Sequence, residues 1–193
     1  KSRVVIKDGQ VGDYINANWV PGFKNPKRYI ATQGPVPTSI VDFWRMIWQE
    51  KSNVIVKVTR EVEKGVLKCH RYWPDPTSEP PQKVVLLGQI EVEHIKTEAF
   101  KNHIVREFEL RKGAAKLRCV QFSYESWPDH GVPLTTREFL QFRAAVKVET
   151  DVTKTPVVLH CSAGVGRTGT YLVVDRVLDA VENAEKSKDL DVD

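Results

Sequence analysis

The stretch from Val157 to Gly169, VVLHCSAGVGRTG, constrains the fold of this chain more than any other. A short apolar run rich in β-branched residues opens it after Pro156, which is typical of a buried strand, and a glycine-rich loop follows. Thr170 then begins a run with the spacing of an amphipathic helix. A strand, a tight loop and a helix in this order predict a site for a tetrahedral anion, because free backbone N–H groups converge there.

Two side chains in this loop indicate its chemistry. Cys161 lies at the mouth of the anion site, where the helix dipole and Arg167 favour the thiolate, since cysteines at helix N-termini near cations have lowered pKa values. We therefore interpret Cys161 as a nucleophile. Arg167 supplies a planar fork that can hold two phosphate oxygens and stabilise the charge of the transition state. Lysine at this position is expected to bind the phosphate and stabilise the transition state much less well.

Three alternatives compete with this interpretation. A free cysteine at a strand end is usually a buried core residue, but Arg167 and the surrounding glycines disfavour this for Cys161. GVGRTG matches the G-x-G-x-x-G fingerprint of dinucleotide sites, yet the 24 residues after Gly169 leave no room for the second strand and the rest of the sheet. A cysteine protease with His160 as base is disfavoured because neighbours on a strand point to opposite faces.

Composition and cysteine usage describe one domain in a reducing compartment. The 193 residues are 41% apolar and 28% charged, which suits a single full core. No apolar run approaches the roughly 18 residues that span a bilayer, and no signal peptide is visible. Three cysteines without C-x-x-C spacing favour the cytoplasm and argue against zinc. The net charge of +4 suits an acidic substrate, but the cations are scattered, which argues against nucleic acid as a partner.

The remaining patterns predict an α/β domain with a mixed sheet. Apolar residues at helical spacing and capping threonines predict helices over 38–51, from Thr135 or Thr136 onward, and over 167–187. Buried strands are predicted over 53–59 and from 157, and alternating residues predict antiparallel strands over 84–95, 103–110 and 117–124.

Several polar segments are interpreted as turns or loops. On their chemistry alone, 13–18, 24–28 and 29–35 read as solvated turns, and 60–65 reads as a solvated charged turn. The segment 72–82 carries four prolines and is expected to be a surface loop.

The loop SWPDHGVP, from Ser126 to Pro133, holds the candidate general acid. Two prolines and a glycine predict a loop, which Trp127 can anchor at one end. Alone, this segment would be a rigid surface turn. Beside a cysteine–phosphate site, however, breaking a phosphate ester needs an acid for the leaving oxygen, and a loop aspartate can supply it. Asp129 is the candidate, with His130 as second choice.

Five motifs together resemble the protein tyrosine phosphatase family. In chain order they are DYINA at 13–17, TQGP at 32–35, KCHRYWP at 68–74, WPD at 127–129 and HCSAGVGRTG at 160–169. The cysteine and arginine with five residues between them are shared with dual-specificity phosphatases, but the motifs before residue 75 are associated with a deep pocket suited to phosphotyrosine. DFWRM at 42–46 and WPDHGVP at 127–133 are similar to receptor-type catalytic domains.

This resemblance implies a central, highly twisted mixed β-sheet flanked by α-helices, with the phosphate loop between a strand and a helix. It implies hydrolysis of phosphotyrosine in proteins through a cysteinyl-phosphate, with Cys161 as nucleophile and Asp129 as acid and then base. No metal or other cofactor is needed. The implied phosphate ligands are the backbone amides and the guanidinium of Ser162, Ala163, Gly164, Val165, Gly166 and Arg167.

The resemblance also implies supporting residues around this centre. His160 is expected to help keep Cys161 ionised, and Thr168 to donate a hydrogen bond to the leaving thiolate. Glu63 is expected to pair with Arg167. Lys68 is expected to lie near the mobile acid loop, and Trp127 and Arg167 near the hinge of that loop.

Two segments of the family pattern have no counterpart in the sequence. The substrate-recognition loop would lie before Lys1, and the glutamine-bearing loop that positions the hydrolytic water would follow Asp193. We therefore expect residues 1–193 to be a single, partial catalytic domain. The alternatives are a phosphotyrosine-binding module without turnover and a dual-specificity phosphatase. By analogy with receptor-type relatives, the chain would be an intracellular domain with any membrane tether outside it.

Overall fold

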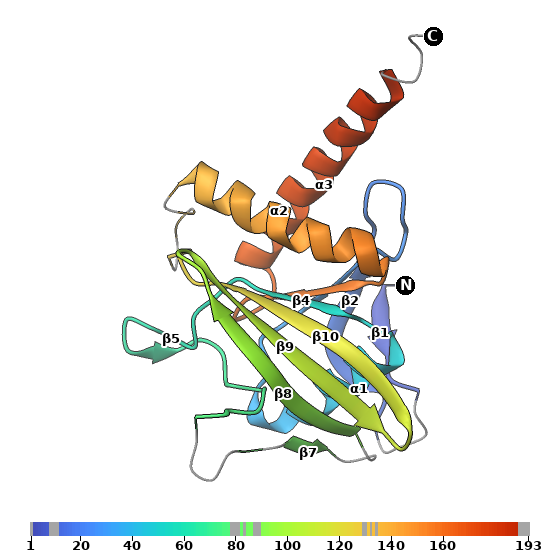
Figure 1. Cartoon of the computed structure of the whole chain (residues 1–193), viewed down its shortest axis with the longest axis vertical. Coiled ribbons are helices and arrows are strands. Elements are labelled where there is room, and N and C mark those ends of the chain that lie inside the picture. Colours follow the sequence, from blue (N-terminus) through green and yellow to red (C-terminus); the bar gives the residue numbers. More distant parts are fainter. Residues whose placement is uncertain are drawn as a thin grey trace.

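A mixed β-sheet forms the centre of the computed structural model, which describes residues 2–7, 12–77, 82, 84–86, 90–128, 131, 133 and 135–188. Over these residues the strand order is β1-β2-β3-β11-β4-β10-β9-β8-β7. Figure 1 shows this sheet, with β4, β10, β9 and β8 labelled across it. The strands are β1 (Arg3–Val5), β2 (Tyr14–Val20), β3 (Tyr29–Thr32), β4 (Val54–Lys57), β7 (Val84–Leu86), β8 (Ile90–Ala99), β9 (His103–Lys112), β10 (Ala115–Tyr124) and β11 (Val157–His160).

The middle of the sheet is parallel and positions the site. β11 pairs in parallel with both β3 and β4, and β4 pairs in parallel with β10. The last residue of β11, His160, lies in register with Thr32 at the end of β3 and with Lys57 at the end of β4. Loops that follow parallel strands therefore meet at one edge of the sheet, which is where α/β proteins bind ligands.

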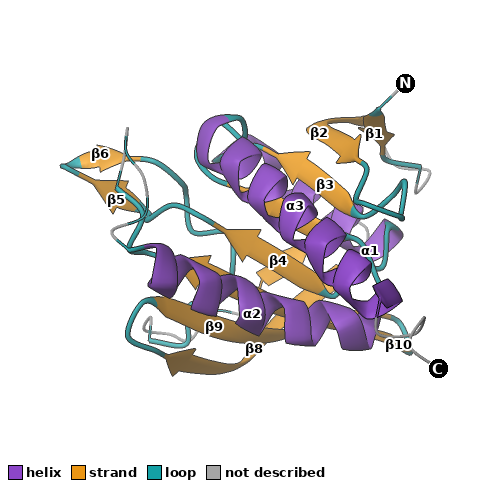
Figure 2. Cartoon of the chain, turned by 90° about the horizontal axis from the view of Figure 1, so that it is seen from above, coloured by secondary structure: helices purple, strands orange, loops and turns teal. Residues whose placement is uncertain are grey.

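Helices cover both faces of the sheet (Figure 2). The turn η1 (Pro37–Ser39) leads into α1 (Ile40–Gln49) on one face, while α2 (Thr136–Thr153) and α3 (Gly166–Lys188) lie on the other. Because strand residues alternate between faces, Val158 packs in the core under α1, while Val157 and Leu159 pack in the core under α2 and α3. The mixed sheet flanked by helices agrees with the predicted architecture.

The predicted helices and the buried strands at β4 and β11 are confirmed, with small shifts at their ends. Thr135 caps α2, since its side chain accepts a hydrogen bond of 3.2 Å from the Glu138 amide. The single strand predicted over 84–95 is wrong. It is two strands, β7 and β8, which pair with each other in antiparallel fashion, so the chain reverses direction between them.

The interpretation of 13–18 and 29–35 as solvated turns is also wrong, because β2 and β3 occupy most of these segments. β3 lies between β2 and β11, and Ile30 is fully buried. Asparagines on β2 and a threonine on β3 interrupt the apolar alternation that is typical of strands. The extended conformation becomes favourable only when these segments pair with neighbouring strands. Strand propensity depends strongly on such context.

The charged segment 60–65 contributes to a small hairpin outside the main sheet. β5 (Val62–Glu63) and β6 (Val66–Leu67) pair around a two-residue turn at Lys64 and Gly65, whose φ angles are 50° and 77°. Positive φ at both positions is the geometry of a type I′ hairpin turn. The turn is exposed as expected, but Glu63 beside it is buried. None of the described helices has the length and apolar character needed to cross a membrane.

Candidate active site

The loop after β11 brings Cys161 and Arg167 to the carboxyl edge of the sheet. β11 ends at His160, and α3 begins at Gly166, so the intervening residues turn tightly. Gly164 has a φ of 80°, and a Cβ atom there would lie 2.3 Å from the carbonyl oxygen of Thr32. Only glycine fits this position. Other residues adopt this positive φ only with strain, and their Cβ atom would collide with the backbone of β3. The expected phosphate ligands, from Ser162 to Arg167, all lie in this loop and the first turn of α3.

The surroundings of Cys161 favour its thiolate. Its side chain is buried, and its Sγ atom accepts a hydrogen bond of 3.2 Å from the Gly164 amide. Burial by itself raises the pKa of this thiol, but the hydroxyl and amide of Thr168, the Gly164 amide and the charge of Arg167 outweigh it, and the pKa lies below its ordinary value. The loop therefore favours the thiolate, which is the nucleophilic form of the sulfur.

Arg167 is held by a carboxylate from the β5–β6 hairpin. Its Nη1 and Nη2 atoms lie 2.6 and 2.8 Å from the two carboxylate oxygens of Glu63, so the pair is bidentate. Nη1 also approaches the carbonyl oxygens of Val58 and Trp127, at 3.4 and 3.3 Å. These contacts fix the plane of the guanidinium beside Cys161, and the pairing of Glu63 with Arg167 that the resemblance implies is present in the fold.

Glu63 remains ionised in this buried position. Burial raises its pKa, but hydrogen bonds from Arg167, the Arg60 amide and the Thr59 hydroxyl outweigh this and bring the pKa below its ordinary value. The carboxylate thus keeps its charge through several donors, as buried charges require.

His160 lies behind the loop and does not contact the sulfur of Cys161. Its Nδ1 atom is 2.9 Å from the Cys161 carbonyl oxygen, and its Nε2 atom is 2.8 Å from the hydroxyl of Tyr72. Burial outweighs the hydrogen bond to Cys161 and lowers the pKa of His160 to about 3. The ring is therefore neutral, so any influence on Cys161 passes through the backbone and not through a positive charge on the imidazole.

The acid loop is described only in part. Asp129 and His130 lie outside the described residues. Trp127 is buried at the start of the loop, and its Nε1 atom donates a hydrogen bond of 3.0 Å to the Gly131 carbonyl. Because Arg167 contacts the Trp127 carbonyl, the phosphate loop and the beginning of the acid loop are in direct contact.

Lys68 borders a cavity of about 220 Å³ beside the phosphate loop. Its backbone amide donates a hydrogen bond of 2.8 Å to the Glu61 carbonyl, which fixes its place after β6. The lining residues are Gln33, Gly34, Pro35, Val36, Leu67, Lys68, Cys69, His70, Ser162 and Ala163. Among the described residues, no three His, Cys, Asp or Glu side chains are placed to hold a metal ion.

Two residues that support the loop were assigned no role from the sequence. Tyr72 belongs to the motif KCHRYWP, and its hydroxyl contacts His160. The amide of Gly34, in the motif TQGP, donates a hydrogen bond of 2.8 Å to the Ser162 carbonyl, and a Cβ atom there would lie 2.6 Å from the Cys161 oxygen. The motifs that contain Tyr72 and Gly34 were the only sequence signal that these residues matter. Their roles could not be inferred, because their partners lie far away in the chain.

Comparison with known proteins agrees with this geometry. A family model described as protein-tyrosine phosphatase matches residues 1–193. Receptor-type tyrosine-protein phosphatase U of Gallus gallus is 44% identical over 172 residues, which cover 88% of this chain and 12% of that protein. Receptor-type tyrosine-protein phosphatase S of Gallus gallus is 42% identical over 194 aligned residues, covering 98% of this chain and 12% of that protein.

Solved structures include a close match of the fold. One, from work on the structural basis of the PTPN18 fingerprint on distinct HER2 tyrosine phosphorylation sites, superposes with a TM-score of 0.87 at 31% sequence identity. The match covers 95% of this chain and 65% of that one. The chain thus spans 12% of the length of these curated relatives and 65% of that solved chain. The chain belongs to the protein-tyrosine phosphatase family.

Proposed function

We propose that this chain is the catalytic part of a protein-tyrosine phosphatase, which hydrolyses phosphotyrosine in proteins through a cysteinyl-phosphate intermediate. The observation that carries the proposal is the pairing of a lowered-pKa Cys161 with a guanidinium clamped by Glu63 at the same loop. A thiolate and a fixed arginine fork are what attack on a phosphate ester requires, since positioning and electrostatic stabilisation dominate phosphoryl transfer.

In the first step, the sulfur of Cys161 attacks phosphorus, an S–P bond forms, and the bond from phosphorus to the tyrosine oxygen breaks. The loop amides and Arg167 stabilise the phosphoryl oxygens as charge shifts onto them. Asp129 protonates the leaving tyrosine oxygen. We assign this role from the sequence, because Asp129 lies outside the described residues.

In the second step, water attacks phosphorus and the S–P bond breaks. Asp129, now a carboxylate, accepts a proton from the water, and Cys161 leaves as a thiolate, which Thr168 stabilises. The contact between Arg167 and the Trp127 carbonyl supports a coupling between the phosphate loop and the acid loop during this cycle.

The partners we propose are phosphotyrosine-containing proteins. Since the curated relatives are receptor-type tyrosine phosphatases, of which the chain covers 12%, we assign the 193 residues to one partial catalytic domain of such a protein. We place it in the cytoplasm, with any membrane tether outside these residues.

The test is phosphate release from matched phosphotyrosine and phosphoserine peptides. Release from phosphotyrosine alone is expected, and Cys161→Ser is expected to abolish it while binding of the phosphotyrosine peptide persists. Cys119→Ser is the matched control, because it makes the same change at a buried cysteine on β10, outside the phosphate loop. This control is expected to retain turnover.

Each of the other outcomes would contradict a different part of the proposal. Release from both peptides would indicate dual specificity. Phosphotyrosine binding without release would indicate a binding module that does not turn over. Turnover that survives Cys161→Ser would show that the nucleophile is misassigned.

A further inference from the structure

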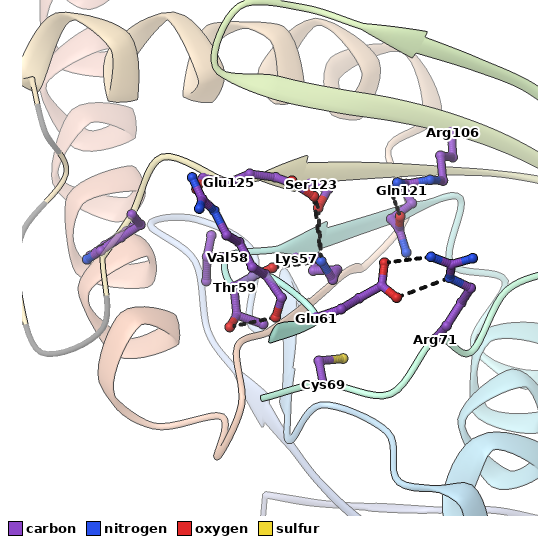
Figure 3. Close-up of polar contacts among 12 residues, drawn as sticks. Lys57, Val58, Thr59, Glu61, Cys69, Arg71, Arg106, Gln121, Ser123 and Glu125 are labelled. Atoms are coloured by element: carbon purple, nitrogen blue, oxygen red, sulfur yellow. Dashed lines mark hydrogen bonds and ion pairs between the residues drawn. The ribbon is translucent and has the colours of Figure 1, made fainter. Parts of the chain in front are cut away.

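A line of hydrogen bonds, part-buried at Arg106 and buried from Gln121 onward, runs from strand β9 to the phosphate loop. Arg106 Nη1 donates to Gln121 Oε1 at 2.9 Å, and Gln121 Nε2 donates to the Tyr72 hydroxyl at 2.8 Å. That hydroxyl contacts His160 Nε2 at 2.8 Å, and His160 Nδ1 contacts the Cys161 carbonyl at 2.9 Å. Figure 3 shows the first of these contacts, with Gln121 on β10 facing Arg106. Four hydrogen bonds thus join the outer part of the sheet to the nucleophile's own peptide group.

The chemistry of the groups fixes the direction of every bond in this line. A backbone carbonyl can only accept, so His160 Nδ1 carries the proton, and Nε2 of the neutral ring must accept. The Tyr72 hydroxyl therefore donates to His160 and accepts from the amide nitrogen of Gln121. A guanidinium can only donate, so Arg106 requires the oxygen of Gln121 on its side.

The last bond of the line orients an amide of the anion site. Because a peptide group is planar and trans, holding the Cys161 carbonyl behind the loop turns the Ser162 N–H to the opposite side. The next carbonyl, of Ser162, is held in the same way by the amide of Gly34 at 2.8 Å. Both contacts act on the back of the loop, so they determine where its N–H groups point.

Arg106 determines the direction in which the hydrogen bonds of this line donate. The oxygen and nitrogen of a glutamine amide have nearly the same shape, so Gln121 without a donor-only partner can turn its oxygen toward Tyr72. Tyr72 would then donate to Gln121, and His160 would change tautomer and lose its proton toward Cys161. The guanidinium is itself fixed, since it lies 4.7 Å from the centre of the Trp73 ring.

We propose that Arg106 and Gln121 are positioning residues for the phosphatase reaction, which set the tautomer of His160 and through it the orientation of the Cys161–Ser162 peptide. The proposal rests on the proposed function, because it assigns a role within the same site. In the structure, Arg106 and Gln121 reach the phosphate loop only through Tyr72 and His160.

The tautomer of His160 is the direct readout. Long-range proton–nitrogen NMR of the whole 193-residue chain is expected to show a protonated Nδ1 and an unprotonated Nε2 in the unmodified protein. Arg106→Met should give a mixture of tautomers, and Arg106→Lys, which keeps a donor-only group, should restore most of the original signal. Gln121→Glu should give the other tautomer, because the new carboxylate accepts the Tyr72 proton while it still pairs with Arg106.

Function is measured as kcat on a phosphotyrosine peptide and as affinity for tungstate, a tetrahedral anion that needs only the loop. Arg106→Met and Gln121→Glu are expected to lower both by about three- to tenfold, the effect of one misdirected hydrogen bond. Arg118→Met on β10 is the matched control, because Arg118 pairs with surface carboxylates such as Glu107, and should change neither. Urea unfolding identifies any variant that is not folded.

The two proposals can fail separately. If the unmodified chain binds tungstate but releases no phosphate, the proposed function fails, while the tautomer and tungstate measurements still test the positioning role. An unchanged His160 tautomer in folded Arg106→Met and Gln121→Glu would overturn the positioning role. A changed tautomer with unchanged tungstate affinity and kcat would overturn it as well.

Discussion

The three cysteines show how strongly surroundings control one functional group. Burial raises the pKa of Cys69 to about 12, although the charge of Lys57 acts in the opposite direction. Burial also raises the pKa of Cys119. Cys161 is buried too, yet hydrogen-bond donors and Arg167 bring its pKa below the ordinary value. The difference between these thiols is the presence of donors and not the degree of exposure.

This difference predicts selective oxidation. Dilute peroxide at pH 7 is expected to convert Cys161 to the sulfenic acid well before Cys69 or Cys119, because only the thiolate reacts rapidly. A thiol reductant should restore turnover after brief exposure. Trapping of the sulfenic acid followed by peptide mass spectrometry checks the site. Equal modification of the three cysteines would contradict a lowered pKa at Cys161.

At the scale of elements, the β5–β6 hairpin places a buried carboxylate against Arg167. Its two-residue turn needs positive φ at both central positions, and Gly65 meets this need at 77° without strain. Lys64 is held at 50°, a conformation that side chains adopt less readily. The hairpin is short, so the geometry of its turn controls the position of Glu63.

Gly65→Ala is therefore expected to lower both stability and activity. Alanine at positive φ costs about 1–2 kcal/mol, and the displaced Glu63 would no longer orient Arg167, so kcat should fall. Gly113→Ala is the matched control. Gly113 has a φ of 59° in the β9–β10 turn, and a Cβ atom at either glycine would have no neighbour within 4 Å. Both variants should lose similar free energy of unfolding, measured in urea.

Activity separates the two glycine variants. Only Gly65→Ala should reduce kcat on a phosphotyrosine peptide. An equal loss of kcat in Gly113→Ala would mean that general loosening, and not the position of Glu63, explains the effect.

For the whole molecule, folding favours the neutral form of several histidines, because burial lowers their pKa values. His160 lies at the junction of the sheet and the phosphate loop, and its pKa is lowered to about 3. Burial also lowers the pKa of His94 and His103. An unfolded chain takes up these protons near the ordinary pKa of about 6.5, whereas the folded chain does not. Folding stability therefore decreases as the pH falls below that value.

We expect the free energy of unfolding to decrease between about pH 6.5 and pH 4, with His160 contributing up to about 1.4 kcal/mol per pH unit. Urea unfolding at several pH values measures this slope. His160→Asn should reduce the slope, because the substitution removes the buried ring. An identical slope in the His160 variant would show that this ring is not buried in its neutral form.

How far the sequence predicts the structure depends on whether a feature is local. The helices α1, α2 and α3 follow from apolar spacing and capping within single segments, and all three are confirmed. β2 and β3 could not be recognised, because their polar residues resemble turns until neighbouring strands pair with them. Similarly, the reversal between β7 and β8 is visible only in their pairing.

By itself, the sequence determined the strand–loop–helix that carries Cys161 and Arg167, since thirteen consecutive residues define it. Through its motifs it also indicated the family, which the comparisons confirmed. Only the tertiary structure decided what surrounds this loop. Glu63 lies 104 positions before Arg167, and Tyr72 lies 88 positions before His160. Contacts between such distant residues depend on strand order and side-chain packing, which no local pattern encodes.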